Sequence, residues 1–443
     1  IRDPEMSRGL VDVYKRQIGM YSIIIYLFTK LYGGYKVGFL RVMDVLFSQI
    51  LSLVCANIVG YIELCIIARN YLPALNMIEL TFLEIIVIFI WVFVCRMMYR
   101  KFYPPRHLLL VYGYKTPTEF IDKINARKDK YIIADRIHVS EGEKALKEKI
   151  LQYDGVILCE TKAYIRNELV KYCFEHSIRS YVVPKLSDII ILGAEPIHLF
   201  DTPLLLSRNQ GLTGEDMIFK RLMDIIVSLI MIIIFSPFMI LIALAIKLYD
   251  RGPVFYKQDR LTLNGRVFKI MKFRSMRMDS EEHGAQLARK HDDRITPVGR
   301  VIRATHLDEL PQLFNILKGD MSVVGPRPER PEIAAQYRET FPEFDYRLKM
   351  KAGLTGYAQV YGKYNTTPRD KVKLDLTYYE QYSLWLDLKL ILLTFKILFQ
   401  KENTEGIDAN QTTAIREDKT KKTGIKHPHD EAEDAFYSVE EKK

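Results

Sequence analysis

Apolar residues gather in a few long blocks along this chain, and charged residues fill the segments between them. Two blocks, Val45 to Ile67 and Leu80 to Cys95 with its flanking residues, have the length and composition of membrane-spanning helices. The short loop between them contains Pro73, so the pattern predicts a helical hairpin. Several lysine and arginine residues flank the outer ends, whereas the loop offers only Arg69, so we expect both outer ends on the cytoplasmic side.

The two ends of the chain give weaker signals. The apolar run Ile18 to Phe28 is too short to cross a bilayer on its own. Residues 1–17 match no structural element and do not start with methionine, so we interpret them as non-native sequence. We expect the transmembrane region, residues 18–105, to be truncated at its N-terminus. Residues 402–443 are polar and mixed in charge, which predicts a disordered tail.

Short apolar segments alternate with polar helical stretches across residues 106–212, as in "HLLLVYGY", "YIIADRIHV", "GVILCE" and "RSYVVP". This alternation is typical of an α/β domain with a parallel sheet, here Rossmann-like. A dinucleotide site would need a glycine-rich turn after the first strand, and Gly113 stands there alone. We therefore expect a degenerate domain with a docking or regulatory role.

The third strong apolar block, Leu222 to Ile246, is flanked by lysine and arginine on both sides. A helix that crosses a membrane once has its positive charge mainly on one side. Ser236 and Pro237 stand near the centre, where the proline bends the helix and the serine hydroxyl can bond to a freed carbonyl. We predict a re-entrant helix over residues 222–246, with a kinked spanning helix as the alternative.

The formal net charge of +10 favours a membrane or a phosphorylated substrate over nucleic acid, because the basic residues stand beside the apolar blocks. We therefore expect no nucleic-acid partner. The five cysteines form no CxxC pair and have no histidine at ligand spacing, so neither a disulfide framework nor a zinc site is expected.

A basic segment with alternating apolar residues follows the third block, and its centre is an Asn-Gly pair. This pattern predicts a β-hairpin. Its basic side chains are expected at exposed positions, on a surface suited to phosphate or to anionic lipid. These side chains are Arg260, Arg266, Lys269, Lys272 and Arg274.

Two adjacent carboxylates, Asp308 and Glu309, stand just before Pro311 in the stretch "THLDELPQLF". With Asp308 at or near a helix N-cap, Pro311 would fall in the first turn. The macrodipole would keep Asp308 ionised and able to act as a nucleophile or metal ligand. A plain capping aspartate is the alternative. The apolar face of this helix would consist of Leu310, Leu313 and Phe314.

A second feature of this region is the turn "GPRP", Gly325 to Pro328. Its two prolines fix the backbone and hold Arg327 in a preset position that suits bidentate contact with phosphate oxygens. Mg²⁺ usually accompanies phosphate and takes one or two carboxylates together with substrate oxygens. Asp308, Glu309 and Arg327 are therefore a candidate set for phosphoryl transfer.

The run "KRLMD … GPVFYKQDR … FKIMKFRSM … RITPVGR … LDELPQLFNILKGDMSVVGPRPE … GLTGYAQVYG … YYEQYSLWLDLKLI" resembles the bacterial sugar transferases, monotopic phosphoglycosyl transferases that act on polyprenyl phosphate. The resemblance covers about residues 218–401, and the helices and degenerate α/β domain before it look like those of the larger members. The chain departs from the family pattern at His306, Ala352 and Lys363, where serine, proline and arginine are frequent.

The resemblance implies a membrane-associated α/β enzyme with a catalytic domain at residues 213–401 that combines the re-entrant helix with amphipathic interfacial helices, such as Ser383 to Phe399. It implies Asp308 as the nucleophile, Glu309 as a Mg²⁺ ligand and the Ser236-Pro237 bend as the membrane anchor. The substrate and phosphate contacts expected with them are Arg327, Lys272, Arg274, Arg260, Arg300 and Gln359.

The implied reaction transfers a sugar 1-phosphate from a UDP-sugar to undecaprenyl phosphate and releases UMP, at the cytoplasmic face of the bacterial inner membrane. It would be the first membrane step of capsule, exopolysaccharide or O-antigen synthesis. The expected partners are the UDP-sugar, undecaprenyl phosphate, membrane lipids and, in a homo-oligomer, further copies of the chain. The alternatives are a catalytically idle membrane scaffold or regulator, and a lipid-linked glycosyltransferase that releases UDP.

Overall fold

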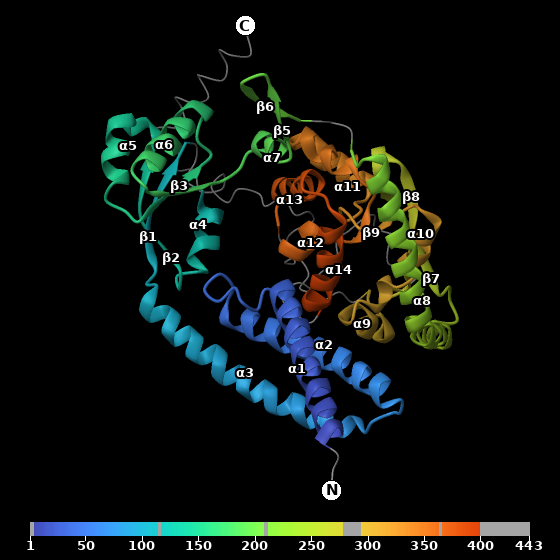
Figure 1. Ribbon diagram of the computed structural model, residues 1–443. Coiled ribbons are helices and arrows are strands. Elements are labelled where there is room, and N and C mark those ends of the chain that lie inside the picture. The colour runs from blue at the N-terminus through green and yellow to red at the C-terminus, as the bar shows by residue number, and fades with distance from the viewer. Residues whose placement is uncertain (1–3, 114–116, 208–210, 278–293, 363–365, 399–443) are drawn as a thin grey trace. The chain divides into compact units, whose positions relative to one another are not determined.

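The computed structural model describes residues 4–113, 117–207, 211–277, 294–362 and 366–398 (Figure 1). Lys363 and the predicted tail at 402–443 lie outside these residues. The chain divides into two compact units. The described residues of the first unit lie within 4–217 and 376–398, and those of the second within 218–375.

The first unit begins with three long helices, α1 (Pro4–Tyr32), α2 (Val42–Ala68) and α3 (Ala74–Phe102). The predicted hairpin is confirmed by α2 and α3. Together with α8 (Gly214–Asp250), these two are long and apolar enough to cross a membrane, which indicates a membrane protein. The interpretation that residues 1–17 match no structural element is wrong from Pro4 onward, because α1 begins there. Once the following apolar run is helical, each added residue gains a hydrogen bond without a new nucleation step, so the helix can extend toward the N-terminus.

Parallel strands form the sheet of the α/β part, as predicted, in the order β2-β1-β3-β4. The central strand β1 packs Leu109 and Val111 under α5 and α6, whereas Leu108 and Leu110 face α4 (Figure 1). Both faces are therefore covered, which explains the nearly continuous apolar strands. The bounds are β1 Arg106–Tyr112, α4 Thr118–Asn125, β2 Tyr131–His138, η1 Val139–Glu141, α5 Glu143–Ile150, β3 Gly155–Cys159, α6 Ala163–Glu175 and β4 Arg179–Val182.

A short helix and an antiparallel hairpin follow the sheet: α7 (Leu186–Leu192), β5 (Glu195–Leu199) and β6 (Thr202–Leu206). The last helix of the unit, α14 (Leu384–Leu398), packs against α1 and α2. Its Lys396 is buried and donates from Nζ to the Ser48 hydroxyl at 2.7 Å.

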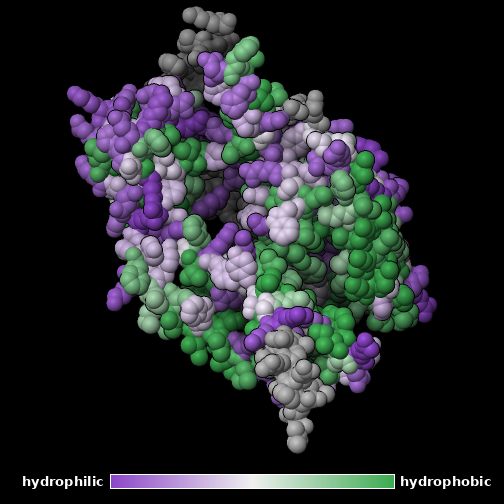
Figure 2. Space-filling model, in the orientation of Figure 1, coloured by the Kyte–Doolittle hydropathy of each residue, from purple (hydrophilic) through white to green (hydrophobic). Residues whose placement is uncertain are grey.

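The second unit begins with the long helix α8, which contains Pro237. Proline leaves the carbonyl of Ile233, four residues earlier, without its usual donor, and the Ser236 hydroxyl donates to that carbonyl at 2.9 Å, as predicted. Figure 2 shows a hydrophobic surface over this helix. The exposed apolar side chains there include Ile226, Leu229, Ile230, Ile233, Ile234, Phe238, Ile240, Leu241 and Leu244.

The predicted β-hairpin is confirmed by the antiparallel strands β7 (Phe255–Leu261) and β8 (Val267–Phe273). Asn264 and Gly265 both adopt positive φ between them, which suits a tight hairpin turn. The elements that follow are η2 Leu263–Gly265 within that turn, α9 Pro297–Ala304, η3 Leu307–Glu309, α10 Gln312–Lys318, β9 Ser322–Val324, α11 Pro331–Thr340, η4 Pro342–Lys349, β10 Gly353–Thr355, α12 Tyr357–Tyr361 and α13 Pro368–Glu380, whose last residues belong to the first unit.

A close backbone approach beside the parallel pair β9 and β10 requires glycine. A Cβ atom on Gly325 would lie 2.2 Å from the Lys351 carbonyl oxygen, and one on Gly353 would lie 2.1 Å from the Gly325 nitrogen. The "GPRP" turn is therefore set against β10 through backbone contacts that larger residues would push apart.

Candidate active site

Asp308 and Glu309 lie in the short 3-10 helix η3, between α9 and α10. His306, directly before η3, adopts a left-handed backbone conformation with φ 56°. This conformation is uncommon for residues with a side chain and turns the chain sharply after α9. The two carboxylates therefore lie on a separate short element, after the end of α9 and before the start of α10.

The prediction that Asp308 caps the following helix is wrong, because α10 starts only after Pro311, which is itself the N-cap. The segment is held by bonds between residues three apart, from the Leu310 nitrogen to the Leu307 carbonyl at 3.3 Å and from the Leu313 nitrogen to the Leu310 carbonyl at 3.1 Å, as in a 3-10 helix. The predicted apolar face is right for Leu313, which is buried, and wrong for Phe314, which is exposed.

The Asp308 side chain is buried, with the residue only 9% exposed. Burial and, second, the neighbouring negative charge of Glu309 raise the pKa of Asp308 to about 6. Because α10 begins only after Pro311, Asp308 does not occupy the helix N-terminus at which a dipole would offset this shift. Among the residues that the structure describes, none donates a hydrogen bond to this carboxylate. Its oxygens are thus available to bond to an electrophile.

Glu309 has two cationic partners that come from other segments. Its Oε1 accepts from Lys272 Nζ on β8 at 2.6 Å and from Arg327 Nη2 in the "GPRP" turn at 2.8 Å. Burial opposes the charge of Glu309, but Arg327 and Lys272 outweigh it and hold the pKa of Glu309 well below its usual range. The two adjacent carboxyls therefore differ in protonation behaviour, which favours separate roles for them.

A small cavity beside Glu309 gathers three cations that the sequence predicted as phosphate contacts: Arg260, Lys272 and Arg327. Gln312 of α10 also lines it. Arg260 donates to the Pro328 carbonyl at 3.0 Å and to Gln258 at 2.6 Å, while its buried Nε has no partner among the described residues. Burial lowers the pKa of Arg260 to about 10, so a bound anion would be stabilised here.

The prediction of exposed hairpin side chains is right for Arg266 and Lys269 and wrong for Arg274 and Arg260. Arg274 follows the end of β8, is buried, and pairs with Asp250 at the end of α8. Arg260 of β7 pairs with Phe268 of β8, and Lys272 lies four residues after Phe268 on the same strand. Because side chains alternate between the two faces of a strand, Arg260 and Lys272 share one face of the hairpin, the face that lines the cavity.

Two further predicted contacts lie elsewhere in the unit. Arg300 is exposed on α9. Gln359 of α12 donates to the Leu354 carbonyl at 3.3 Å, and its buried Oε1 has no partner in the described part of the chain. Gly356 separates this amide from the start of the "GPRP" turn, since a Cβ there would lie 2.5 Å from Gln359 Oε1 and 2.1 Å from the Gly325 oxygen. Gln359 thus adjoins the turn rather than the carboxylates.

Sequence reasoning missed the buried ion cluster behind the "GPRP" turn. Arg347 of η4 donates from Nη2 to the Arg327 carbonyl oxygen at 3.0 Å and pairs with Asp375 at 2.9 Å. Its Nη1 lies 3.5 Å from Glu329, which also lies 3.7 Å from Lys371. Arg347 therefore fixes the backbone of Arg327. The stretch "YRLKMKAG" offered no signal beyond its charge.

We expect Arg347→Met to lower the free energy of unfolding by about 3 kcal/mol, because Asp375 would stay buried without its main cationic partner. Chemical denaturation of the detergent-solubilised protein measures the change. Arg338→Met is the matched control, since its pair with Asp345 is partly exposed and should contribute less than about 1 kcal/mol. Equal effects of the two substitutions would contradict this account of the cluster.

The donor set suits a magnesium ion only with help from a substrate. Among the described residues, no three or more acidic, histidine or cysteine side chains are arranged so that they could hold a metal ion together. Mg²⁺ at phosphoryl-transfer sites usually takes one or two carboxylates, with phosphate oxygens and water completing the shell. Glu309 supplies one such carboxylate, so the site fits the predicted ion.

Comparison with known proteins adds independent information on this region. The family model described as "Bacterial sugar transferase" matches residues 215–401. A UDP-glucose:undecaprenyl-phosphate glucose-1-phosphate transferase of Caulobacter vibrioides is 40% identical over 189 residues, which cover 42% of this chain and 71% of that protein. The chain belongs to the bacterial sugar transferase family.

Two longer relatives are similar to a comparable length of this bacterial sugar transferase. The UDP-glucose:undecaprenyl-phosphate glucose-1-phosphate transferase of Klebsiella pneumoniae is 43% identical over 46% of this chain. The UDP-N-acetylgalactosamine-undecaprenyl-phosphate N-acetylgalactosaminephosphotransferase of Aeromonas hydrophila is 44% identical over 40% of it. The matched region spans 43% of the length of each relative.

Proposed function

We propose that this sugar transferase moves a sugar 1-phosphate from a UDP-sugar to undecaprenyl phosphate, giving undecaprenyl diphosphate sugar and UMP. The observation that carries the proposal is the site itself. A buried carboxylate without hydrogen-bond donors among the described residues, Asp308, stands next to Glu309. The two cations that bind Glu309, Lys272 and Arg327, line a small cavity together with Arg260. The names of the relatives, which act on UDP-sugars and undecaprenyl phosphate, support the substrate class.

Asp308 acts as the nucleophile in two steps. One of its oxygens bonds to the β-phosphorus of the UDP-sugar, the bond from that phosphorus to the bridging oxygen breaks, and UMP leaves with the electron pair. A phosphate oxygen of undecaprenyl phosphate then bonds to the same phosphorus and releases the Asp308 carboxylate. Arg327, Lys272 and Arg260 neutralise the phosphoryl oxygens in both steps.

Glu309, with Asp308 beside it, would hold a Mg²⁺ ion against the diphosphate. The ion supplies charge neutralisation at the phosphate oxygens when it is bound. Lys272 and Arg327 bind Glu309 Oε1, and this pairing keeps the carboxylate ionised. A glutamate held ionised is a better metal ligand than one that must first lose a proton.

We infer that α8 is a re-entrant helix whose two ends face the cytoplasm, with the catalytic residues on that side of the bacterial inner membrane. The N-terminal part of α8 contacts α10 through Arg221 and β9 through Asp224. The C-terminal part packs Met239, Ile242 and Ile246 into the apolar cluster that contains residues flanking the carboxylates. Both ends of α8 thus contact the rest of the second unit. This supports a bend at Pro237, because a helix that crossed the membrane straight would place its two ends on opposite sides of the bilayer.

Single cysteines at Phe219 and Tyr249, both exposed, test this topology. We expect a membrane-impermeant maleimide applied to intact cells to label neither position, and the same reagent to label both after the membrane is permeabilised. A cysteine placed at Tyr71, exposed between α2 and α3, is the positive control for labelling from outside. Labelling of Phe219→Cys or Tyr249→Cys in intact cells would contradict the re-entrant proposal.

The released nucleotide distinguishes the proposed reaction from its rivals. Membranes that contain the protein, undecaprenyl phosphate and Mg²⁺ are incubated with a panel of UDP-sugars, and the products are separated by chromatography. We expect UMP with at least one sugar. Release of UDP would indicate a glycosyltransferase that moves the sugar alone, and no nucleotide release with any donor would favour a scaffold or regulator. Homo-oligomer formation and the docking role of the α/β part stay predictions.

A further inference from the structure

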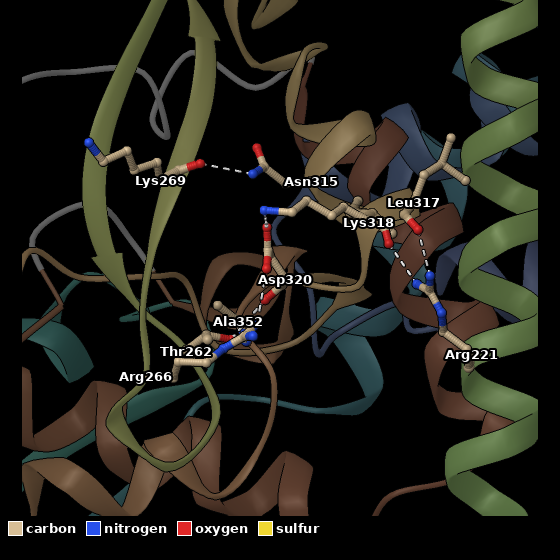
Figure 3. A network of polar contacts seen from close by, with 10 residues as sticks. Arg221, Thr262, Arg266, Lys269, Asn315, Leu317, Lys318, Asp320 and Ala352 are labelled. Atoms are coloured by element: carbon tan, nitrogen blue, oxygen red, sulfur yellow. Dashed lines mark hydrogen bonds and ion pairs between the residues drawn. The ribbon is translucent and has the colours of Figure 1, made fainter.

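Arg221, near the N-terminal end of α8, binds the end of α10. Arg221 donates from Nη1 to the Ile316 carbonyl at 2.6 Å and from Nη2 to the Leu317 carbonyl at 2.6 Å (Figure 3). These carbonyls belong to the last turn of α10, which leaves acceptors without helical partners. A guanidinium at a helix C-terminus also suits the macrodipole there. Arg221 therefore caps α10 from another helix.

Asp224, one turn further along the same helix, accepts hydrogen bonds from β9. Its Oδ1 accepts from the Ser322 hydroxyl at 2.9 Å and from the Val323 backbone nitrogen at 2.8 Å. Asp224 and Ser322 are both buried, at 2% and 0% exposure. Buried hydrogen bonds to a charged acceptor are costly to lose, so this contact holds the strand firmly.

The two bound elements, α10 and β9, adjoin the segments that carry the catalytic groups. The N-terminal end of α10 follows Glu309 after two residues, and β9 runs directly into the turn that holds Arg327. The link between them is also fixed from the hairpin side, because Thr262 donates to the Asp320 carbonyl at 3.0 Å and accepts from the Ala352 nitrogen at 3.1 Å (Figure 3). Arg221 and Asp224 thus join a membrane helix to a rigid block that contains the active site.

Exposed apolar side chains lie on α8 on both sides of these contacts, Ile218, Phe219 and Leu222 near Arg221 and Ile226, Leu229 and Ile230 after Asp224. We propose that Arg221 and Asp224 are positioning residues that fix the height of Asp308 above the lipid headgroups, and that the lipid half of the reaction needs them far more than the nucleotide half. This inference rests on the proposed function. A soluble nucleotide can reach the site at any height, whereas the phosphate of a membrane lipid is confined to the headgroup level, and a displacement of 1 Å can cost about a hundredfold in rate.

The test separates the two half-reactions in the full chain, reconstituted in phospholipid nanodiscs. UMP released with UDP-sugar and no lipid acceptor reports the first half, and transfer of the bound phosphosugar to added undecaprenyl phosphate reports the second. For Arg221→Met and Asp224→Ala we expect the first half within about threefold of the unchanged protein and the second half at least about tenfold slower. Lys318→Met is the control, since Lys318 contacts Asp320 in the same network at 3.1 Å but does not touch α8. Both of its half-reactions should be unaffected.

A second acceptor distinguishes positioning from a general loss of structure. The phosphate of a short-chain, water-soluble prenyl phosphate is not confined to the headgroup level, so it can reach Asp308 at any height above the membrane. It should therefore restore the second half-reaction of the variants to within about threefold of the unchanged protein. Arg221→Lys, a milder change that keeps the cation, should show the same selectivity with a smaller defect. Equal losses in both halves, or a defect that persists with the short acceptor, would overturn the inference. Absence of both half-reactions in the unchanged protein would instead refute the proposed function.

Discussion

Asp308→Asn is expected to lower the rate of UMP release by about three orders of magnitude or more, with little change in stability. The amide has the shape of the carboxylate but cannot form the bond to the β-phosphorus, so both steps of the transfer fail. The stability expectation follows from the geometry, because no described residue donates a hydrogen bond to the Asp308 side chain. UMP release in membranes and thermal unfolding in detergent measure the two quantities.

The matched control for this variant is Asp259→Asn, the same chemical change at an exposed position of β7. It should leave UMP release within about twofold of the unchanged protein. Activity of Asp308→Asn comparable to that of the control would exclude Asp308 as the nucleophile. A large loss of stability in Asp308→Asn would show instead that the carboxylate serves the fold.

The second large effect is expected for Glu309→Gln, about a hundredfold loss of turnover together with a higher Mg²⁺ requirement. The substitution removes the charge that Lys272 and Arg327 share, so these cations lose their common partner and the proposed metal loses a ligand. UMP release over a series of Mg²⁺ concentrations separates the two contributions, because added metal should recover part of the activity.

Glu332→Gln, on the exposed face of α11, is the control for the loss of one glutamate charge. Its Mg²⁺ dependence should match that of the unchanged protein. If Glu309→Gln kept full turnover at low Mg²⁺, neither metal binding nor orientation of Arg327 could be its role.

Local patterns predicted those parts of the molecule that depend on neighbouring residues. The α2 and α3 hairpin, the parallel sheet and the Asn264-Gly265 hairpin follow from apolar length, alternation and turn chemistry. The bond from Ser236 to the Ile233 carbonyl also follows, because proline removes a known donor at a known offset.

Features that depend on distant partners could not be predicted in this way. Arg274 and Lys272 look equivalent in a basic strand, yet the end of β8 turns one toward Asp250 while the other reaches Glu309. Arg347 acts through Asp375 and the Arg327 carbonyl, which are far away in sequence. The raised pKa of Asp308 likewise follows from burial by residues of several elements, which a single helix-capping argument omits.

The most direct test of the central claim is a search for the covalent phosphosugar on Asp308. The full chain is incubated with labelled UDP-sugar and Mg²⁺ but without lipid acceptor, then denatured, digested and examined by mass spectrometry. Our account predicts one phosphosugar on the peptide that contains Asp308, accompanied by one equivalent of UMP, and release of the label when undecaprenyl phosphate is added before denaturation. Label on a peptide that lacks Asp308, or lipid-dependent turnover without any labelled protein, would contradict it.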